Sequence, residues 1–316
     1  MKMEHIIDKN YFPGWVRKSV TFTIDDGNIE MDKKFIDIVR PAGIRGTFNL
    51  CYSDRLSPEE YREMYRGFEI SNHVVYHPEI FVPGTPYIFS EEPFNKESAD
   101  YKTVYHHPEV EGAWLVSGYY YGINPDRWLL IVYPDRYNEL LDETTESLNA
   151  IFGEGAVRSF VWPFGQQVDY KPVLKHVEEI GFYGARDAGS PHKGFTLPED
   201  RLHWKYCAMD HNILEVMEQF EALEDDGELK FFSFGVHSID YERNNTWKNL
   251  TAFCEKYANR PADYYYGTVG EIFDYEDAIG ALEITDSEII NPSSLTVYLK
   301  IDGSPVTVAP KSSYKL

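Results

Sequence analysis

Two neighbouring carboxylates mark the first place in the chain where chemistry could occur. Asp25-Asp26-Gly27 ends a β-branched and aromatic run of residues. Two adjacent ionised carboxylates repel each other, so the pair favours a bound cation or some other functional reason for being there. The simpler alternative is a solvated turn, because Asp-Gly is common in loops. Taken alone, the motif favours the turn.

Two histidines form the second motif. His73 and His77 lie four positions apart, and Pro78 follows them. At this spacing both imidazoles would lie on one face of a helical turn, an arrangement that can chelate a divalent metal. The alternative is a pair of unrelated histidines, and the spacing alone does not decide between the two.

Two later motifs each end an apolar run. Pro163-Phe164-Gly165 predicts a turn whose backbone N–H groups could act as oxyanion donors. His237 ends a run rich in phenylalanine, where it could serve as a general acid or base. Considered separately, the first motif is only a strand and a turn, and a lone histidine at the end of a strand is more often structural.

The elements that must position these motifs alternate between strands and helices. Predicted strands cover residues 20–24, 46–50, 67–71, 157–161, 181–185 and 229–236. Predicted helices cover residues 32–40, 58–66, 135–151, 170–180, 210–222 and 247–257. This alternation is typical of an α/β fold with parallel strands. Each motif follows a predicted strand, which is where βα architectures place their active sites.

An aromatic-rich insertion interrupts the alternation. Residues 78 to about 134 contain much Pro, Gly and Tyr and predict an irregular segment without a long amphipathic helix. Its aromatic side chains could form a wall for sugar rings or merely the small core of the insertion. These side chains are Tyr87, Tyr101, Tyr105, Trp114, Tyr119, Tyr120, Tyr121, Trp128 and Tyr133.

The C-terminal residues change character again. Hydrophobicity alternates from Leu295 to Ile301, and the turn signal Asp302-Gly303 precedes a second short β-branched run. We therefore expect a main domain at residues 1–276 and a β-hairpin appendage at 277–316 that packs on it, since 40 residues are too few to fold alone.

Charge and hydropathy exclude several classes of protein. Acidic residues outnumber basic ones by 52 to 30, which gives a net charge of −22. Such a surface repels phosphate backbones and anionic membranes, so we expect no nucleic-acid partner and no membrane insertion. The chain as given has no signal peptide, which predicts a cytoplasmic protein, or a periplasmic or secreted one if a leader has been removed. The oligomeric state is not predicted.

In combination and in this order, the motifs resemble those of the NodB-homology polysaccharide deacetylases, carbohydrate esterase family 4. Thr23-Ile24-Asp25-Asp26-Gly27 is similar to the family's Thr-Phe-Asp-Asp-Gly signature. Residues 67–78 resemble its Gly-His-Glu-Ile-Gly-Asn-His…His-Pro segment, and residues 42–48 fit the run between the two. The resemblance spans about residues 15–276, with an interruption after Pro78.

The resemblance implies a distorted (β/α)7-type barrel with a metal in a groove at its C-terminal face. Asp26, His73 and His77 would hold a divalent cation, most often Zn²⁺, with Co²⁺ or Ni²⁺ as alternatives. Two imidazoles and one carboxylate suit zinc, and open coordination positions are typical of a catalytic site. Asp25 would be the general base that activates water, and His237 the general acid that protonates the leaving group.

The implied activity is hydrolysis of N- or O-linked acetyl groups on an acetylated oligo- or polysaccharide. The turn at Pro163 and Phe164 would stabilise the oxyanion through the backbone N–H of Phe164. Two alternatives stay open: hydrolysis of another non-peptide C–N bond, and a carbohydrate-binding relative that has lost turnover. The net charge further predicts a preference for neutral over acidic glycans.

One departure from the family pattern concerns the catalytic base. Val161 stands where the family carries an Arg that pairs with this base, so Asp25 lacks its usual cation. Arg186, which follows a neighbouring predicted strand, is our candidate for the missing charge at the substrate site.

Further departures concern the metal loop and the general acid. Val74 replaces a Ser or Thr that shapes the loop between the two metal-binding histidines. Gly235 stands where a Leu usually forms an apolar wall beneath the acetyl methyl group. The candidate carboxylate partners of His237 are Asp187 and Asp200.

Overall fold

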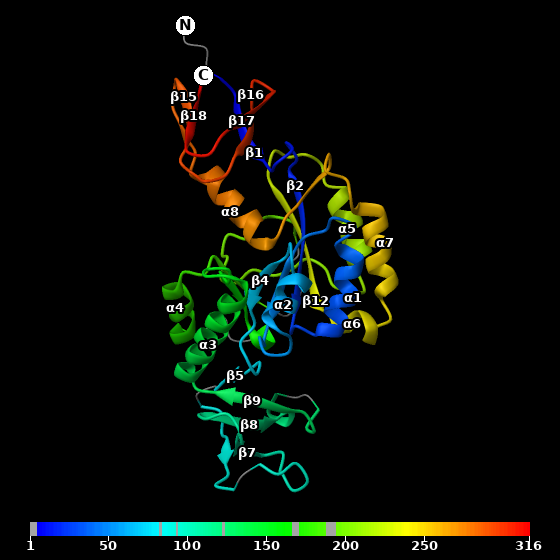
Figure 1. Cartoon of the computed structure of the whole chain (residues 1–316), viewed down its shortest axis with the longest axis vertical. Helices are drawn as coiled ribbons and strands as arrows, with labels where there is room; N and C mark the ends of the chain where they lie inside the picture. The colour runs from blue at the N-terminus through cyan, green and yellow to red at the C-terminus, as the bar shows by residue number, and fades with distance from the viewer. Residues whose placement is uncertain (1–4, 82–83, 93, 122–123, 166–170, 188–193) are drawn as a thin grey trace.

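A parallel sheet forms the centre of the molecule, in a computed structural model that describes residues 5–81, 84–92, 94–121, 124–165, 171–187 and 194–316. Its strands are β2 (Lys18–Asp25), β3 (Thr47–Leu50), β4 (Glu69–Asn72), β10 (Ser159–Val161), β11 (Gly184–Arg186), β12 (Lys230–His237) and β13 (Tyr264–Tyr266). They are ordered β11-β10-β4-β3-β2-β12, and β13 also pairs with β2 (Figure 1). Every pairing in this sheet is parallel.

The sheet curls into a partial barrel. Trp204 bridges to Arg186 at the end of β11, and Ala208 bridges to Phe234 in β12. The segment 204–208 therefore spans the gap between the two outermost strands. The predicted fold class, a distorted α/β barrel, is confirmed.

Helices surround this sheet. They are α1 (Ile29–Val39), α2 (Pro58–Met64), α3 (Pro134–Phe152), α4 (Lys171–Ile180), α5 (Ile213–Glu221), α6 (Ser238–Arg243), α7 (Trp247–Tyr257) and α8 (Val269–Gly280). Figure 1 shows α1, α5, α6 and α7 grouped on one side, with α3 and α4 on the other. None of the helices in the described parts of the chain combines the length and apolar character needed to cross a membrane.

The predicted strands and helices of the main domain are all present, within a few residues of their expected ends. Three further elements were not predicted. Helix α6 has six residues and begins directly after β12, while β13 has only three residues. Helix α8 buries seven of its twelve residues and so lacks a clear polar face.

The core of the barrel is built around the ring of Phe22 in β2. Its centroid lies 5.0 Å from that of Phe35 on α1, 5.3 Å from that of Phe48 on β3 and 5.9 Å from that of Phe234 on β12. Gly46 lies directly against this ring, and a Cβ atom there would sit 2.4 Å from Cγ of Phe22. The close approach of β3 to β2 therefore requires glycine at this position.

The insertion is a sheet of its own, and the expectation of an irregular segment is wrong. Its strands are β5 (Glu79–Ile80), β6 (Ile88–Phe89), β7 (Thr103–His106), β8 (Ala113–Ser117) and β9 (Trp128–Val132). Their order across the sheet is β5-β9-β8-β7-β6. A small aliphatic core holds it together, made by Val104, Val116, Leu129 and Ile131. Strands of two to five residues are too short to show a period in the sequence.

The appendage includes both ends of the chain. The expected hairpin is β16 (Val297–Ile301) and β17 (Ser304–Val308), and β1 (Ile7–Tyr11) completes its sheet. A second sheet contains β14 (Glu283–Ile284), β15 (Glu288–Asn291) and β18 (Ser312–Lys315). In Figure 1, α8 lies between these sheets and the barrel. The division into a main domain with an insertion and an appendage remains our proposal, with β1 moved to the appendage.

Replacing Gly46 tests the packing at the centre of the barrel. Gly46→Ala is expected to lower the free energy of unfolding by about 2 kcal/mol, because the added methyl group overlaps Phe22. Chemical denaturation measures the change. Gly280→Ala is the control, since no atom lies within 4 Å of a Cβ there, and it should be neutral or slightly stabilising. Wild-type stability of Gly46→Ala would contradict this packing.

Candidate active site

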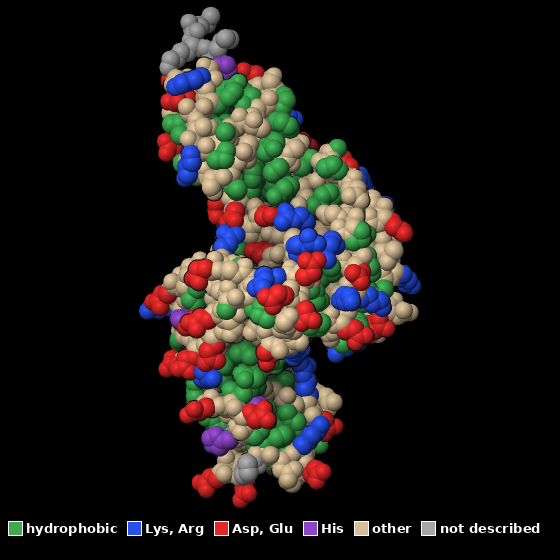
Figure 2. All heavy atoms as spheres, viewed as in Figure 1, with side chains coloured by type: hydrophobic (Ala, Val, Ile, Leu, Met, Phe, Trp, Pro, Cys, Tyr) green, Lys and Arg blue, Asp and Glu red, His purple; other side chains and the backbone are tan. Residues whose placement is uncertain are grey.

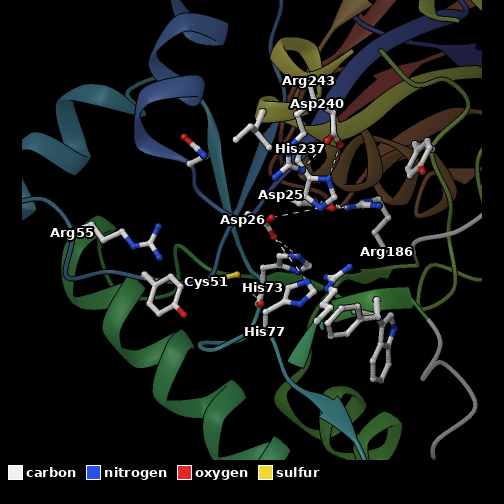
Figure 3. A pocket seen from close by; sticks show the side chains of 17 residues that line it. Asp25, Asp26, Cys51, Arg55, His73, His77, Arg186, His237, Asp240 and Arg243 are labelled. Atoms are coloured by element: carbon white, nitrogen blue, oxygen red, sulfur yellow. Dashed lines mark hydrogen bonds and ion pairs between the residues drawn. The ribbon is translucent and has the colours of Figure 1, made fainter. Parts of the chain in front are cut away.

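A cavity of about 820 Å³ opens where the central strands end. Asp25 ends β2, Arg186 ends β11 and His237 ends β12, and all three side chains face this cavity (Figure 3). The remaining site residues expected from the sequence that line it are Asp26, His73, His77 and Phe164. Pro163 is buried and does not belong to the lining. The structure thus brings together motifs that are 212 positions apart, from Asp25 to His237.

Three side chains converge on one point of this cavity. Asp26, His73 and His77 each offer a ligand atom, and these atoms lie within 4.8 Å of one another. Oδ1 of Asp26 lies 3.4 Å from Nε2 of His73 and 3.9 Å from Nε2 of His77. A single ion of the size of Zn²⁺ could contact all three groups after small movements.

The environment of His73 fits a metal ligand. Its Nδ1 lies 3.0 Å from the carbonyl oxygen of Val161, which fixes Nδ1 as the protonated nitrogen. Its Nε2 is buried and has no hydrogen-bond partner. A buried lone pair without a partner is costly, and the same tautomer leaves it free to bind a cation. Burial lowers the pKa of His77 to about 3 and keeps this imidazole neutral, as a metal ligand must be.

The loop that carries the two histidines is not the helical turn expected from their spacing. Val74, Tyr76 and His77 have φ angles of 49°, 66° and 50°, in the left-handed region that β-branched and aromatic residues rarely adopt. The two imidazole rings nevertheless approach to 4.7 Å between centroids. Asp26 and Phe164 also have positive φ, so backbone strain gathers around this cavity, as is common at functional sites.

Helix α3 supports this loop. The backbone N–H of Val75 donates to Oγ1 of Thr144 at 2.9 Å, and that of Val74 donates to Oδ1 of Asn72 at 2.7 Å. The Val74 side chain is fully buried. A hydroxyl from α3 thus contacts the loop beside the position where the family has Ser or Thr.

A buried ion pair holds Asp25, the first carboxylate of the Asp-Asp motif. Both oxygens of Asp25 accept hydrogen bonds from Arg186, and Oδ1 also accepts one from Nδ2 of Asn49 at 2.7 Å. Burial would raise the pKa of Asp25, but the charge of Arg186 outweighs it and holds the pKa below its usual value. Asp25 therefore stays ionised.

Arg186 takes the place of the arginine that the family carries at the position of Val161. Val161 and Arg186 are directly opposite each other in the parallel register of β10 and β11. The charge that the family places on one strand therefore comes here from the next strand. Nε of Arg186 also donates to Oγ1 of Thr23 at 3.1 Å, which fixes the guanidinium beneath β2.

His237 is held by a carboxylate that the sequence interpretation missed. Its Nδ1 donates to Oδ2 of Asp240 at 2.8 Å, while Nε2 faces Oδ2 of Asp26 at 3.6 Å. Burial would lower the pKa of His237, but the bond to Asp240 and the nearby carboxylates raise it to about 9. Asp240 lies in the first turn of α6, three residues after His237, and the unpredicted short helix hid it.

The two carboxylates expected beside His237 lie elsewhere, and that expectation is wrong. Oδ2 of Asp187 is 3.1 Å from Nζ of Lys205. Oδ2 of Asp200 is 3.8 Å from Nε2 of His203, in an exposed turn. Neither residue belongs to the cavity lining.

The space left by Gly235 is occupied by an aromatic ring. A Cβ atom at Gly235 would lie 3.0 Å from Cδ1 of Tyr206 and 2.8 Å from Cγ2 of Thr23. Tyr206 lines the cavity, and the guanidinium of Arg186 lies 5.3 Å from the centre of its ring. An apolar wall is therefore present at this place, supplied by the segment that closes the barrel.

The other aromatic walls of the cavity are Tyr52, Trp162 and Phe164. The ring of Phe164 lies 4.4 Å from that of His77 in an edge-on arrangement. None of the insertion's tyrosines and tryptophans whose side chains are described lines this cavity; the side chains of Tyr120 and Tyr121 lie outside that description. The described aromatic side chains of the insertion are thus not part of this cavity wall.

The sequence of the chain matches the model of one protein family. Residues 16–185 match the model of the polysaccharide deacetylase family. This match covers more than half of the chain, which therefore belongs to the polysaccharide deacetylase family, a family of hydrolases, and the family resemblance is confirmed. No curated protein sequence matches the chain.

Solved structures with a similar fold include three carbohydrate-active enzymes. A family 4 carbohydrate esterase from Streptomyces lividans, solved with acetate, is 12% identical, with 79% of this chain and 91% of that chain covered and a TM-score of 0.43. A chitin deacetylase from Colletotrichum lindemuthianum is 14% identical, with 84% and 89% covered and a TM-score of 0.42. A family 4 esterase from Streptococcus mutans is 14% identical, with 80% and 86% covered and a TM-score of 0.45.

Another buried carboxylate, Asp32, lies outside the cavity lining. Oδ1 of Asp32 on α1 accepts a hydrogen bond from Ser238 at 2.5 Å, and Oδ2 accepts one from Tyr65 at 2.8 Å. Burial raises the pKa of Asp32 to about 7, against the effect of both hydrogen bonds. Because Ser238 follows His237, this network links α1 to the start of α6.

The raised pKa of Asp32 predicts a pH-dependent stability. The folded state binds this proton up to about pH 7, whereas the unfolded chain loses it near pH 4, so the free energy of unfolding falls as the pH rises between these values. Asp32→Asn should remove on the order of 2 kcal/mol of this fall in denaturation experiments at pH 5 and pH 8. The control is Asp37→Asn, exposed on the same helix, which should keep the wild-type pH dependence. An unchanged dependence in Asp32→Asn would contradict the assignment.

Proposed function

We propose that this chain is a divalent-metal-dependent deacetylase that removes N- or O-linked acetyl groups from a carbohydrate. The observation that carries the proposal is the convergence of Asp26, His73 and His77 beside a separate, ionised Asp25. The buried Nε2 of His73, which has no hydrogen-bond partner, supports a cation at this point. Membership of the polysaccharide deacetylase family supports the acetylated carbohydrate as substrate.

The proposed metal ligands are Asp26, His73 and His77, and we propose Zn²⁺, with Co²⁺ or Ni²⁺ as alternatives. When bound, such a cation supplies Lewis-acid chemistry, polarising the acetyl carbonyl and making water more acidic. The ligand set leaves coordination positions open toward the cavity, which suits a catalytic centre.

Asp25 is the proposed general base. Its carboxylate takes a proton from the attacking water, and Arg186 and Asn49 hold it in place through hydrogen bonds. The guanidinium keeps the buried carboxylate ionised, which a base requires. Since Asp25 is occupied with these partners, Asp26 is the member of the pair that is free to face the two histidines.

His237 is the proposed general acid. In its protonated form, Nδ1 stays bonded to Asp240 while Nε2 points into the cavity and can donate a proton to the departing amine or alcohol. The proposed oxyanion donor is the backbone N–H of Phe164, whose positive φ aims the turn at the cavity. The products are acetate and the deacetylated sugar.

The alternative of a binding protein without turnover loses its main support. That alternative rested on Val161, which leaves the catalytic base without the family's cation. Since Arg186 provides a guanidinium to Asp25 from the next strand, the base has a counter-ion. Hydrolysis of another non-peptide C–N bond uses the same residues, and an acetate-release assay distinguishes the two activities.

Metal binding and acetate release test the proposal together. The purified protein is expected to hold about one equivalent of Zn²⁺ and to release acetate from acetylated chito- or xylo-oligosaccharides, and chelation should abolish release. Asp26→Asn and His73→Gln should lose both the metal and the activity. Asp25→Asn should keep the metal but lose at least about 100-fold in kcat, because a base contributes that much.

His211→Gln serves as the matched control, since its side chain is 60% exposed and lies outside the cavity. It should retain both metal and activity. Wild-type protein that binds no divalent metal at micromolar concentrations, or an Asp25→Asn variant with normal turnover, would contradict the proposal.

Exchanging residues between β10 and β11 tests the role of Arg186. Arg186→Gln should lower the free energy of unfolding by about 3 kcal/mol, since it leaves the buried Asp25 without its partner, and should reduce kcat. Adding Val161→Arg should restore part of the activity, because these positions are opposite each other. Arg158→Gln removes a half-exposed ion pair with Asp274 and should cost no more than about 1 kcal/mol. Equal effects of both Gln substitutions would contradict this role.

A further inference from the structure

The charge of the cavity differs from that of the chain. Over the whole sequence acidic residues outnumber basic ones by 52 to 30, and Figure 2 shows side chains of both signs interspersed over one face. Among the described residues, in contrast, the cavity lining contains four arginines and three aspartates, without lysine or glutamate. A bound divalent cation would add further positive charge. The lining is therefore locally cationic in a strongly acidic protein.

Two of the four arginines already have carboxylate partners. Arg186 pairs with Asp25, and Arg243 lies 3.4 Å from Asp240. Asp26 faces the three imidazoles of the site. All three acidic residues of the lining are thus accounted for by neighbours other than the two remaining arginines.

The remaining arginines, Arg55 and Arg127, have no carboxylate partner among the described residues. Arg55 lies in the loop between β3 and α2, and its guanidinium is 4.2 Å from the ring centre of Tyr52. Arg127 immediately precedes β9 of the insertion, and its guanidinium is 5.6 Å from the ring centre of Phe164. Both rings line the cavity. Stacking on a ring holds a guanidinium in position while leaving its N–H groups free to donate.

Arg127 lies close to the proposed reaction centre. The ring on which it stacks, Phe164, lies against the ring of His77, a proposed metal ligand. Two backbone hydrogen bonds hold Arg127 itself: its N–H donates to the carbonyl oxygen of Asn124 at 3.1 Å, and its carbonyl oxygen accepts from the N–H of Gly118 at 2.7 Å. Arg55 lines the cavity from another element, and in the view of Figure 3 it lies on the opposite side from Arg186. Guanidiniums from two separate elements thus line one cavity.

We propose that Arg55 and Arg127 bind an anionic substituent, a carboxylate or a phosphate, carried by the acetylated sugar or its neighbour. This inference rests on the proposed deacetylase function and names its substrate class: acidic rather than neutral acetylated glycans. Guanidinium groups bind oxyanions through charge-assisted, often bidentate hydrogen bonds. Two guanidiniums in the lining without carboxylate partners among the described residues attract an anion into the cavity.

The negative net charge of the chain favours neutral glycans, but most of that charge lies on surface residues farther from the ligand than the cavity lining is. At physiological salt, exposed charges more than about 8 Å away are largely screened. The groups that line the cavity contact the ligand directly and are screened much less. We therefore replace the expectation of a preference for neutral glycans by the preference that the lining favours.

The test compares three acetylated trisaccharides that differ in one substituent: a neutral one, one with a carboxylate and one with a phosphate on the sugar next to the acetylated unit. Wild-type enzyme should show a higher kcat/KM for an anionic substrate than for the neutral one, and the difference should shrink as NaCl is raised. Arg55→Gln and Arg127→Gln should each reduce this ratio by about 10-fold, the value of one charge-assisted contact. The better anionic substrate identifies the substituent.

Arg66→Gln is the matched control, because Arg66 is 72% exposed and pairs with Glu63 on the outside of α2. It removes the same charge and should leave the ratio unchanged. A wild-type enzyme that prefers the neutral substrate, or equal effects of Arg66→Gln and the two cavity variants, would overturn the inference.

A binding measurement separates this inference from the proposed function. Calorimetry with the deacetylated trisaccharides reports anion recognition without turnover. Tighter binding of the anionic sugars, lost in Arg55→Gln and Arg127→Gln, would support the anion site even if no acetate is released from any substrate. Equal binding of neutral and anionic sugars would overturn the anion site even if acetate is released.

Discussion

The buried ion pair between Asp25 and Arg186 is the interaction on which the site depends. It links the end of β2 to the end of β11 across the mouth of the barrel. Taking two charges out of water is costly, and the cost is met only because further hydrogen bonds from Asn49 and to Thr23 satisfy both groups. With Asp25 held in this way, the adjacent Asp26 is left to face the two histidines. One ion pair therefore separates the surroundings of two neighbouring carboxylates and, in the proposed function, their roles.

The site keeps its chemical groups while changing the elements that supply them. Where the family pattern has an arginine on one strand, this chain carries Val161 and takes the charge from Arg186 on the next. Tyr206 fills the space above Gly235, and Thr144 of α3 supports the histidine loop beside Val74. Each replacement comes from a side chain adjacent in space but distant in sequence. These side chains supply a cation beside Asp25, an aromatic ring beside Gly235 and a hydroxyl beside Val74 from positions outside the family's motifs.

The sequence predicts most elements of the barrel and most residues of the site, but it misses several short elements. The strands of the parallel sheet are apolar runs and the helices have clear amphipathic periods, so both could be predicted, together with the Asp25, Asp26, His73, His77 and His237 motifs that follow the strands. Asp240 was missed because its six-residue helix is too short to show a period. The strands of the insertion, two to five residues long, were also missed. The left-handed turn before His77 was missed since Val and Tyr rarely adopt positive φ and give no sign of it.

The most direct test of the account is a crystal structure of the zinc-loaded protein with anomalous scattering recorded at the zinc absorption edge. We predict one anomalous peak bonded to the carboxylate of Asp26 and to the imidazoles of His73 and His77, with Asp25 still bound to Arg186 and outside the coordination sphere. A peak at any other place, or an ion bonded to Asp25 with Arg186 displaced, would contradict the division of roles between the two carboxylates.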